Sequence, residues 1–224
     1  MERIDDLERD GLRIIQNPSK FCFGIDAVLL SDFAKVKPGE TMIDFGTGTG
    51  VIPILLTSKC PDAKIYYGLE IQEDMADMAR RSVELNHLED RVKIIHGDLK
   101  NVTEIFGHEE ANVVTCNPPY MNDACGLLNA DEGMAIARHE IACTLDDVVA
   151  SAGRILKTGG RFYMIHRPHR LSGIFASMRA HKLEPKRMQM VHSHIGDQAA
   201  MVLIEASKNG GEFLKVEKPI ILYE

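Results

Sequence analysis

The chain has 224 residues, of which 45% are hydrophobic and 26% are charged, and its formal net charge is −7. These values are ordinary for a globular domain, and a chain of this length can bury a full core. The N-terminus is charged and lacks an apolar signal segment, and no apolar run is long enough to cross a membrane. The five cysteines form no CxxC pair. We therefore expect a cytoplasmic protein without a disulfide framework or a metal site.

Strand-like and helix-like segments alternate along the chain from residue 41 onward. Before that point, we predict a short strand at residues 12–16 and a helix at residues 25–33. The further predicted strands are residues 41–45, 64–69, 92–96, 112–116, 161–166, 187–192 and 200–205. The further predicted helices are residues 50–60, 73–86, 144–156 and 171–180. Such alternation is typical of a mostly parallel sheet with helices on both faces, which binds ligands at the carboxyl ends of its strands.

Particular residues mark the ends of three of these elements. Thr144 and Asp147 have the spacing of a capping box and open the helix predicted there. The pair Gly159-Gly160 indicates where that helix stops. A turn at Gly196-Asp197 joins the last two predicted strands, which are close enough in sequence to pair antiparallel.

No repeat, low-complexity tract or long linker divides the chain, so we predict a single domain. Residues 41–224 contain the alternating segments, and residues 1–40 form an N-terminal extension that we expect to pack on them. Residues 121–138 form a long polar loop, and loops of this length beside a site often cover or recognise a substrate.

A glycine-rich turn, DFGTGTG at residues 44–50, follows the predicted strand at 41–45. Glycines let the backbone approach a ligand, and the helix N-terminus that follows favours an anionic group. A dinucleotide fingerprint would need glycine at position 51 or 53, where the chain has Val51 and Pro53. The DxGxGxG pattern instead resembles motif I of S-adenosylmethionine-dependent methyltransferases. The donor-binding residues that we assign from this turn are Asp44, Gly46, Gly48 and Gly50.

Two acidic residues follow the next two predicted strands. Glu70 ends the strand at 64–69, where its carboxylate can accept both hydroxyls of a ribose, and Ile71 beside it can pack against an adenine face. Asp98 ends the strand at 92–96 and can accept a hydrogen bond from the adenine amino group. One acid after each of these two strands matches the arrangement of the methyltransferases that the glycine-rich turn resembles.

The sequence Asn117-Pro118-Pro119-Tyr120 follows the predicted strand at 112–116. The Asn117 side-chain oxygen can accept one N–H of a planar amino group while the Pro118 carbonyl accepts the other, which aligns the nitrogen lone pair with an incoming methyl group. The two prolines fix the backbone, and Tyr120 offers a ring for stacking a base. We therefore predict that Asn117, Pro118, Pro119 and Tyr120 are the catalytic residues for alkylation of such a nitrogen.

Together, the glycine-rich turn and the NPPY motif resemble the amino-methyltransferases, which methylate adenine N6, cytosine N4, guanine N2 or a glutamine amide. The strings FCFGIDAVLL at 21–30, ARHE at 137–140 and HRP at 166–168 are similar to tRNA adenine-N6 methyltransferases that act beside the anticodon of a valine tRNA. The resemblance runs from about residue 11 to the end. It implies a Rossmann-like class I α/β fold whose seven-stranded, mostly parallel sheet has an antiparallel last strand. It also implies S-adenosylmethionine as cofactor, with Phe23 and Asp26 closing the donor pocket.

We also expect an RNA partner, because of a basic segment at residues 151–190. This segment contains nine Lys or Arg residues against one acid, Glu184, so we expect it to contact RNA phosphates, with a solvated face as the alternative. The histidines at positions 166, 169, 192 and 194 form no organised metal-ligand set and are expected to face solvent or RNA.

Other functions remain open at the level of sequence. A protein glutamine-N5 methyltransferase shares the NPPY motif, although that family carries a larger helical N-terminal domain than the roughly forty residues before the donor strand provide. A non-catalytic RNA-binding or cofactor-sensing module on the same fold is the third possibility. The sequence gives no indication of the oligomeric state.

Overall fold

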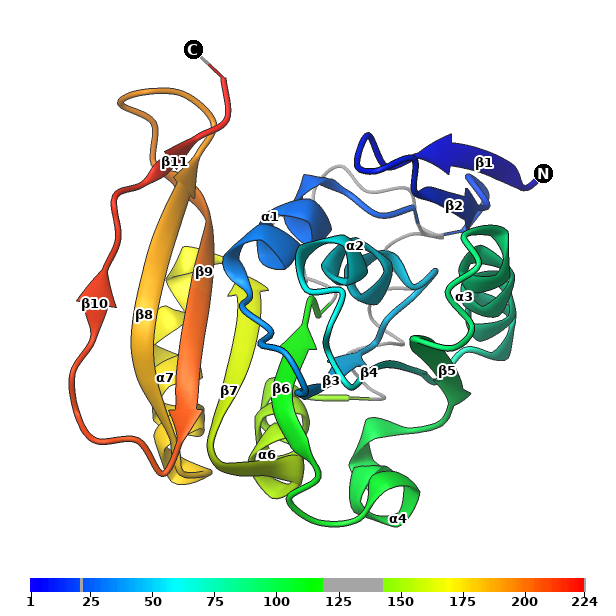
Figure 1. Cartoon of the computed structure of the whole chain (residues 1–224). Coiled ribbons are helices and arrows are strands. Elements are labelled where there is room, and N and C mark those ends of the chain that lie inside the picture. The colour runs from blue at the N-terminus through cyan, green and yellow to red at the C-terminus, as the bar shows by residue number, and fades with distance from the viewer. Residues whose placement is uncertain (21, 119–142, 224) are drawn as a thin grey trace.

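The computed structural model describes residues 1–20, 22–118 and 143–223, and Figure 1 shows a twisted central sheet with helices on both faces. The strands of this sheet are β3 (Thr41–Phe45), β4 (Ile65–Glu70), β5 (Val92–His96), β6 (Ala111–Cys116), β7 (Leu156–His166), β8 (Leu183–His192), β9 (Ala199–Lys208), β10 (Lys215–Val216) and β11 (Ile220–Ile221). The helices of the described residues are α1 (Ile25–Phe33), α2 (Val51–Lys59), α3 (Glu73–Leu85), α4 (Val102–Phe106), α6 (Leu145–Ile155) and α7 (Leu171–Ala180), with the 3-10 turns η1 (Leu99–Asn101) and η2 (Pro168–Arg170).

The strand order confirms the predicted sheet. Its strands run in the order β10-β8-β9-β7-β6-β3-β4-β5, and β11 also pairs with β8. Strands β3 to β7 pair in parallel, whereas β9 lies antiparallel between β7 and β8. The seven strands β3 to β9 therefore form the expected mostly parallel sheet with an antiparallel last strand. The short strands β10 and β11, which the sequence did not indicate, pair in parallel with the outer edge of β8.

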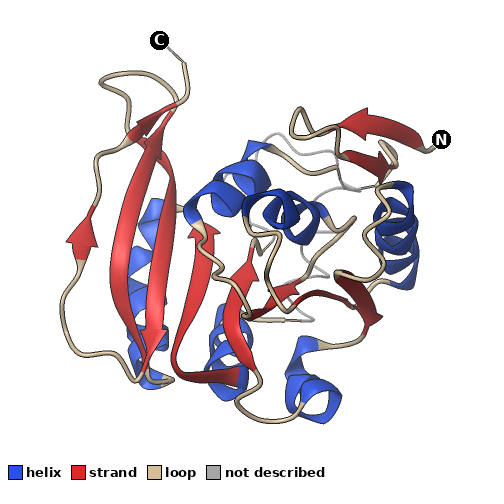
Figure 2. Cartoon of the chain, viewed as in Figure 1, coloured by secondary structure: helices blue, strands red, loops and turns tan. Residues whose placement is uncertain are grey.

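Helices cover both faces of the sheet (Figure 2), and the side chains of its strands pack in two separate core layers. Met42 of β3 packs in one layer with Leu30 of α1 and Ile54 of α2. Its neighbour Ile43 packs in the other layer with Val149 of α6. All five of these side chains are buried. Because both faces are covered, the central strand β3 is buried along its whole length, and the carboxyl ends of the strands are the places where ligands can reach the sheet.

The junction between α6 and β7 differs from the prediction. The capping box is present, since the Asp147 N–H donates to Thr144 Oγ1 at 3.2 Å and the Thr144 N–H donates to Asp147 Oδ2 at 2.9 Å. The expected stop at Gly159-Gly160 is wrong, because α6 ends at Ile155 and β7 begins at the next residue. The glycines instead lie in an irregular part of β7, where Gly159 has a φ of +77° and the pairing with β6 shifts register.

The N-terminal residues form a β-hairpin, β1 (Arg3–Asp6) with β2 (Arg13–Gln16), followed by α1. The hairpin is tied to α3, because Arg81 pairs with Glu2 at 2.7 Å and the Ile15 N–H donates to Ser82 Oγ at 3.0 Å. Helix α1 packs against α2 and β7. The division into an extension at 1–40 and a domain at 41–224 stays a prediction. Among the described helices, none combines the length and apolar character that crossing a membrane requires.

Candidate functional site

The glycine-rich turn between β3 and α2 is held against the end of β4 by backbone hydrogen bonds. The N–H groups of Gly46 and Thr47 donate to the Leu69 carbonyl at 2.9 and 3.1 Å. The Gly48 N–H donates to Glu70 Oε2 at 2.9 Å. Gly46, Gly48 and Gly50 have φ angles of +65°, +56° and +86°, a region that side chains with a Cβ rarely adopt. The turn therefore keeps its shape through glycine conformation and through contacts with β4.

Glu70 is buried at the carboxyl end of β4, with 4% of its surface exposed. Its Oε2 accepts the Gly48 N–H, and its Oε1 accepts the Gln72 N–H at 2.9 Å. A carboxylate oxygen has two lone pairs, so Oε2 can accept a further hydrogen bond, and Oε1 can do so in place of its long 3.4 Å contact with Gln72 Nε2. The side chain is thereby oriented by two backbone groups while it can still accept two ligand hydroxyls. This geometry fits the ribose-binding role that the sequence indicates for Glu70.

Gly68 lets the turn lie directly on β4. A Cβ atom at this position would be 2.7 Å from Thr47 Cγ2 and 2.8 Å from Ile94 Cδ1. Such distances are shorter than non-bonded carbon atoms tolerate, so any larger residue would displace the turn. The sequence alone did not indicate a role for Gly68, although a glycine inside a predicted strand is a signal of close backbone approach.

Asp44 lies beneath the turn and not in an open pocket. It is 1% exposed, and its Oδ1 accepts a hydrogen bond from Thr115 Oγ1 at 2.5 Å. Its Oδ2 has no hydrogen-bond partner within the described part of the chain. Burial raises the pKa of the Asp44 carboxyl to about 7, with the negative charge of Glu70 adding to the increase and the Thr115 hydrogen bond opposing it. Direct donor binding by Asp44 stays a prediction.

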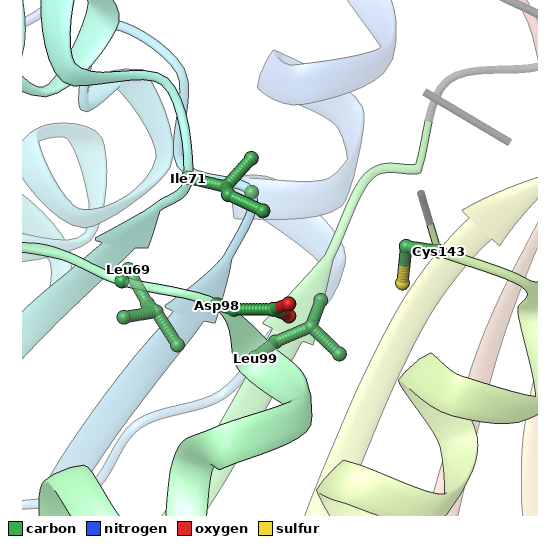
Figure 3. Close-up of a pocket in the computed structure, with 7 residues that line it drawn as sticks. Leu69, Ile71, Asp98, Leu99 and Cys143 are labelled. Atoms are coloured by element: carbon green, nitrogen blue, oxygen red, sulfur yellow. The ribbon is translucent and has the colours of Figure 1, made fainter. Parts of the chain in front are cut away.

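A pocket opens beside the turn (Figure 3), lined by Gly46, Leu69, Ile71, Gly97, Asp98, Leu99 and Cys143. Asp98 follows β5 and caps η1, since its Oδ1 accepts the Lys100 N–H at 2.9 Å. In Figure 3 the Asp98 carboxylate lies beside Leu99, and Ile71 and Cys143 lie on other sides of the pocket. Apolar walls with one carboxylate suit a planar ring that carries an amino group, so the residues present fit the adenine end of a nucleoside.

Cys143 is a pocket residue that the sequence did not indicate, as are Leu69, Gly97 and Leu99. It comes from the segment just before α6 and is far in sequence from the other lining residues. Burial raises the pKa of its thiol to about 11, so the side chain stays protonated and acts as a small, mostly apolar wall. A lone cysteine carries no spacing signal, and its position in the pocket comes only from the fold.

The first residues of the NPPY motif, which we call the acceptor motif, lie beside the glycine-rich turn at residues 44–50, called the donor turn from here on. Strand β6 pairs in parallel with β3, and Phe45 is in register with Cys116. Gly46 and Asn117 are the residues that follow this pair, so they leave the sheet on neighbouring strands about 4.8 Å apart. Pro118 continues from Asn117 as non-regular backbone. The structure thus brings the start of the donor turn and the predicted catalytic amide to one edge of the sheet.

Several predicted residues fall outside the described part of the chain. Pro119 and Tyr120 of the NPPY motif, the loop at 121–138 and the ARHE string at 137–140 are among them. Their proposed roles therefore rest on the sequence.

Phe23 precedes α1, and Asp26 is the second residue of that helix. The Phe23 N–H donates to Gln16 Oε1 at 3.0 Å, and Asp26 Oδ1 accepts the Ala27 N–H at 2.9 Å. Neither residue lines the pocket described above. Their expected part in closing the donor site stays a prediction.

The basic segment at 151–190 does not form one continuous charged face. Some of its arginines pair with carboxylates: Arg161 with Glu40, Arg179 with Glu184 and Arg187 with Glu205. Glu40 and Glu205 lie outside the segment, so its local charge is lower than a count along the sequence indicates. The remaining cations are divided between the two ends of the sheet, because the segment runs through α6, β7, α7 and β8.

The histidines at and after the end of β7 differ in how far they are exposed to solvent. His166, the last residue of β7, is only 8% exposed, so the expectation that it faces solvent or RNA is wrong. Burial lowers the pKa of its imidazole to about 4, and its Nδ1 accepts the Arg167 N–H at 2.7 Å. Further along the chain, His169 and Arg170 are exposed.

The chain matches known proteins over most of its length. The family model described as "Methyltransferase small domain" matches residues 14–180. A protein of Porphyromonas gingivalis named "tRNA1(Val) (adenine(37)-N6)-methyltransferase" is 28% identical over 176 residues, which cover 76% of this chain and 68% of that protein. A protein of Phocaeicola vulgatus with the same name is 27% identical over 181 residues, covering 81% of this chain and 74% of the relative.

Solved structures share the fold. The crystal structure of "a predicted O-methyltransferase", protein Atu636 from Agrobacterium tumefaciens, has a TM-score of 0.71 and 22% identity and covers 88% of this chain and 86% of its own. Geranyl diphosphate C-methyltransferase from Streptomyces coelicolor, solved with S-adenosyl-L-homocysteine, has a TM-score of 0.57 and 17% identity, with coverage of 82% and 78%. At these identities the likeness establishes the fold alone, and it agrees with the strand order described above.

Proposed function

The chain belongs to the methyltransferase small domain family, and from that premise we propose that it transfers a methyl group from S-adenosylmethionine to the N6 amino group of an adenine in tRNA. The relatives from Porphyromonas gingivalis and Phocaeicola vulgatus carry the name of that activity. The register of β3 and β6 carries the proposal within this chain, because it brings Gly46 of the donor turn and Asn117 of the acceptor motif side by side.

The donor would bind across the carboxyl ends of β3, β4 and β5. Glu70 would accept the ribose hydroxyls, since its carboxylate is already oriented by the Gly48 and Gln72 N–H groups. The adenine ring would lie between Ile71 and Leu99, with Asp98 as the acceptor for its amino group. When bound, S-adenosylmethionine supplies a methyl group on a positively charged sulfur. The role of the glycine-rich turn is to bring the backbone close to the donor without side chains in the way.

The acceptor amine would be held by Asn117 and Pro118. An exocyclic amine is a poor nucleophile because its lone pair is delocalised into the ring. If the Asn117 side-chain oxygen accepts one N–H and the Pro118 carbonyl accepts the other, the lone pair points out of the base plane toward the methyl group. The nitrogen becomes acidic once it is methylated, so the transfer requires no strong general base.

The RNA would approach the same edge of the sheet. Arg170 and His169 are exposed there, in η2 directly after β7. Lys157 belongs to the same basic segment but lies at the start of β7, the opposite end of the strand. We therefore restrict the proposed phosphate contacts to the residues that follow β7, instead of the whole segment at 151–190.

The alternatives predict different products from one assay. The protein is incubated with methyl-labelled S-adenosylmethionine and either unmodified tRNA or a protein extract, and the label in each fraction is counted. Label in tRNA supports the proposal. Label in protein as methylglutamine would instead indicate a glutamine-N5 methyltransferase, and binding of the donor without transfer to either fraction would indicate a non-catalytic module.

A further inference from the structure

Two exposed rings lie together at the end of β8. His194 belongs to the turn between β8 and β9, and Tyr223 follows β11 near the C-terminus. Their ring centroids are 5.5 Å apart with an angle of 39° between the planes. More than half of each residue is exposed, with 58% for the His194 side chain and 59% for Tyr223, and the neighbouring Ile195 is 82% exposed. The surface formed by these three residues is called the ring platform below.

The backbone holds the platform in place. The Leu222 N–H donates to the His192 carbonyl at 3.0 Å, and the Tyr223 N–H donates to the Ser193 carbonyl at 2.9 Å, which fixes the C-terminal segment on β8. The His194 N–H donates to Asp197 Oδ2 at 3.2 Å, which closes the turn. The rings are therefore positioned before any partner arrives, and binding need not order the backbone that carries them.

The platform is on the same side of the sheet as the acceptor motif. Figure 1 shows the β8–β9 loop and the segment after β11 at the end toward which β6 and β7 point. Strand β8 is three positions from β6 in the sheet, which corresponds to about 14 Å across the strands. Met190 of β8 and His166 of β7 pair with the same residue of β9, Val202, so His194 lies four residues beyond the level at which β7 ends. The platform therefore stands above the edge of the sheet, to one side of the acceptor site.

We propose that the ring platform stacks an unpaired base of the substrate RNA, one distinct from the base that is methylated. This inference rests on the proposed function. Every base has a π face, so aromatic and imidazole rings bind unpaired nucleotides without reading their sequence. The exposed residues His169 and Arg170 lie at the same edge, and the Arg170 guanidinium suits the phosphates of the connecting nucleotides. Asp197, an acid of the same turn, interacts with His194, whose Nδ1 lies 3.2 Å from Asp197 Oδ2.

The direct test uses tRNA and an RNA hairpin that carries 2-aminopurine at an unpaired loop position, because stacking quenches the fluorescence of this base. The variants are Tyr223→Ala, His194→Ala and Tyr223→Phe. Phe213→Ala is the matched control, since Phe213 is also an exposed ring of the C-terminal segment, 72% exposed, but lies between β9 and β10 at the other end of the sheet. We expect Tyr223→Ala to raise the KM for tRNA by about five- to a hundredfold.

The expected pattern separates this inference from the proposed function. Tyr223→Phe and Phe213→Ala should retain wild-type KM and quenching, and Tyr223→Ala should leave kcat and the Kd for S-adenosylmethionine unchanged. If the wild type methylates tRNA and Tyr223→Ala has the same KM and quenching, the platform is not an RNA contact. A change in oligomeric mass with unchanged RNA binding would assign the surface to a protein partner and also overturn the inference. If the wild type transfers no methyl group to tRNA, the proposed function fails first.

Discussion

The Gly48 N–H donates a 2.9 Å hydrogen bond to Glu70 Oε2, which joins the donor turn after β3 to the carboxyl end of β4. The same carboxylate accepts the Gln72 N–H through its other oxygen. Glu70 therefore fixes the shape of the glycine-rich turn, and in the proposed function it would also accept the ribose hydroxyls. A change at Glu70 should affect the stability of the fold and the affinity for the donor together.

The first prediction concerns Glu70→Ala. The substitution leaves the Gly48 and Gln72 N–H groups without their acceptor, and we expect it to lower the free energy of unfolding by about 1–3 kcal/mol. Loss of the ribose acceptor should weaken S-adenosylmethionine binding by about ten- to a hundredfold, measured by titration calorimetry. Glu73→Gln is the control, because Glu73 is exposed in the first turn of α3. Donor affinity that is equal in Glu70→Ala and the wild type would contradict the assignment.

A second prediction concerns Gly68→Ala. The added Cβ would be 2.7 Å from Thr47 Cγ2 and 2.9 Å from Thr47 Oγ1, so the donor turn must move away from β4. We expect a loss of about 1–3 kcal/mol in the free energy of unfolding and weaker donor binding, both followed by thermal denaturation with and without S-adenosylmethionine. Gly173→Ala is the matched control, because Gly173 of α7 has no atom within 4 Å of the added Cβ. Alanine there should be neutral or slightly stabilising. Equal effects of the two substitutions would argue against the close contact.

Short apolar runs made most of the sheet predictable. Strands β3 and β5 have the bounds expected from the sequence, at 41–45 and 92–96, because each is a continuous apolar or alternating segment ended by a polar or glycine residue. Strand β1 and the two-residue strands β10 and β11 were not predicted, because strands this short show no apolar pattern in the sequence. They are recognisable only by their pairing with β2 and β8. The glycines of β7 resembled a helix stop because sequence does not distinguish a bend inside a strand from a turn.

The site was predictable where function depends on residues that directly follow strands. Glu70 and Asp98 lie at the carboxyl ends of β4 and β5, as expected, because parallel strands end at one edge. Cys143 could not be predicted as a pocket residue, since only the three-dimensional path of the chain brings it there. The basic segment was overestimated for a related reason. The carboxylates that pair with Arg161 and Arg187 come from distant parts of the sequence.

The third prediction is a pH dependence caused by Asp44. Burial raises the pKa of its carboxyl from 3.8 to about 7, so the folded protein holds this proton more tightly than the unfolded chain does. Its contribution to the free energy of unfolding is full below about pH 4 and is lost as the pH rises to about 7. Asp44→Asn keeps an acceptor for Thr115 and does not titrate. The stability of the wild type minus that of Asp44→Asn should therefore fall from pH 4 to pH 7, measured by urea denaturation.

His166 acts in the opposite direction over part of the same range. Its pKa is lowered from 6.5 to about 4, so its contribution to stability is full above about pH 6.5 and is lost as the pH falls toward 4. Because His166 is present in both proteins, its effect cancels in the difference between them. A difference that stays constant or rises between pH 4 and pH 7 would show that Asp44 is ionised throughout.

A fourth prediction compares two cations of the basic segment. Arg170→Glu changes an exposed residue in η2, just after the carboxyl end of β7. Lys157→Glu changes an exposed residue at the opposite end of the same strand. We expect Arg170→Glu to weaken tRNA binding by about tenfold and to lower its salt dependence, with donor affinity unchanged. Lys157→Glu should leave tRNA binding near that of the wild type. Filter binding at several salt concentrations checks this, and an equal loss in both variants would favour a diffuse charge effect over a defined contact edge.

The central claim is that Asn117 holds an adenine amino group beside the donor turn. The most direct measurement is mass spectrometry of nucleosides from tRNA treated with S-adenosylmethionine and either the wild type or Asn117→Ala. We predict N6-methyladenosine from the wild type and a rate about 100- to 1,000-fold lower from Asn117→Ala, with unchanged donor affinity. A different methylated nucleoside, or N6-methyladenosine formed equally fast by Asn117→Ala, would contradict the account.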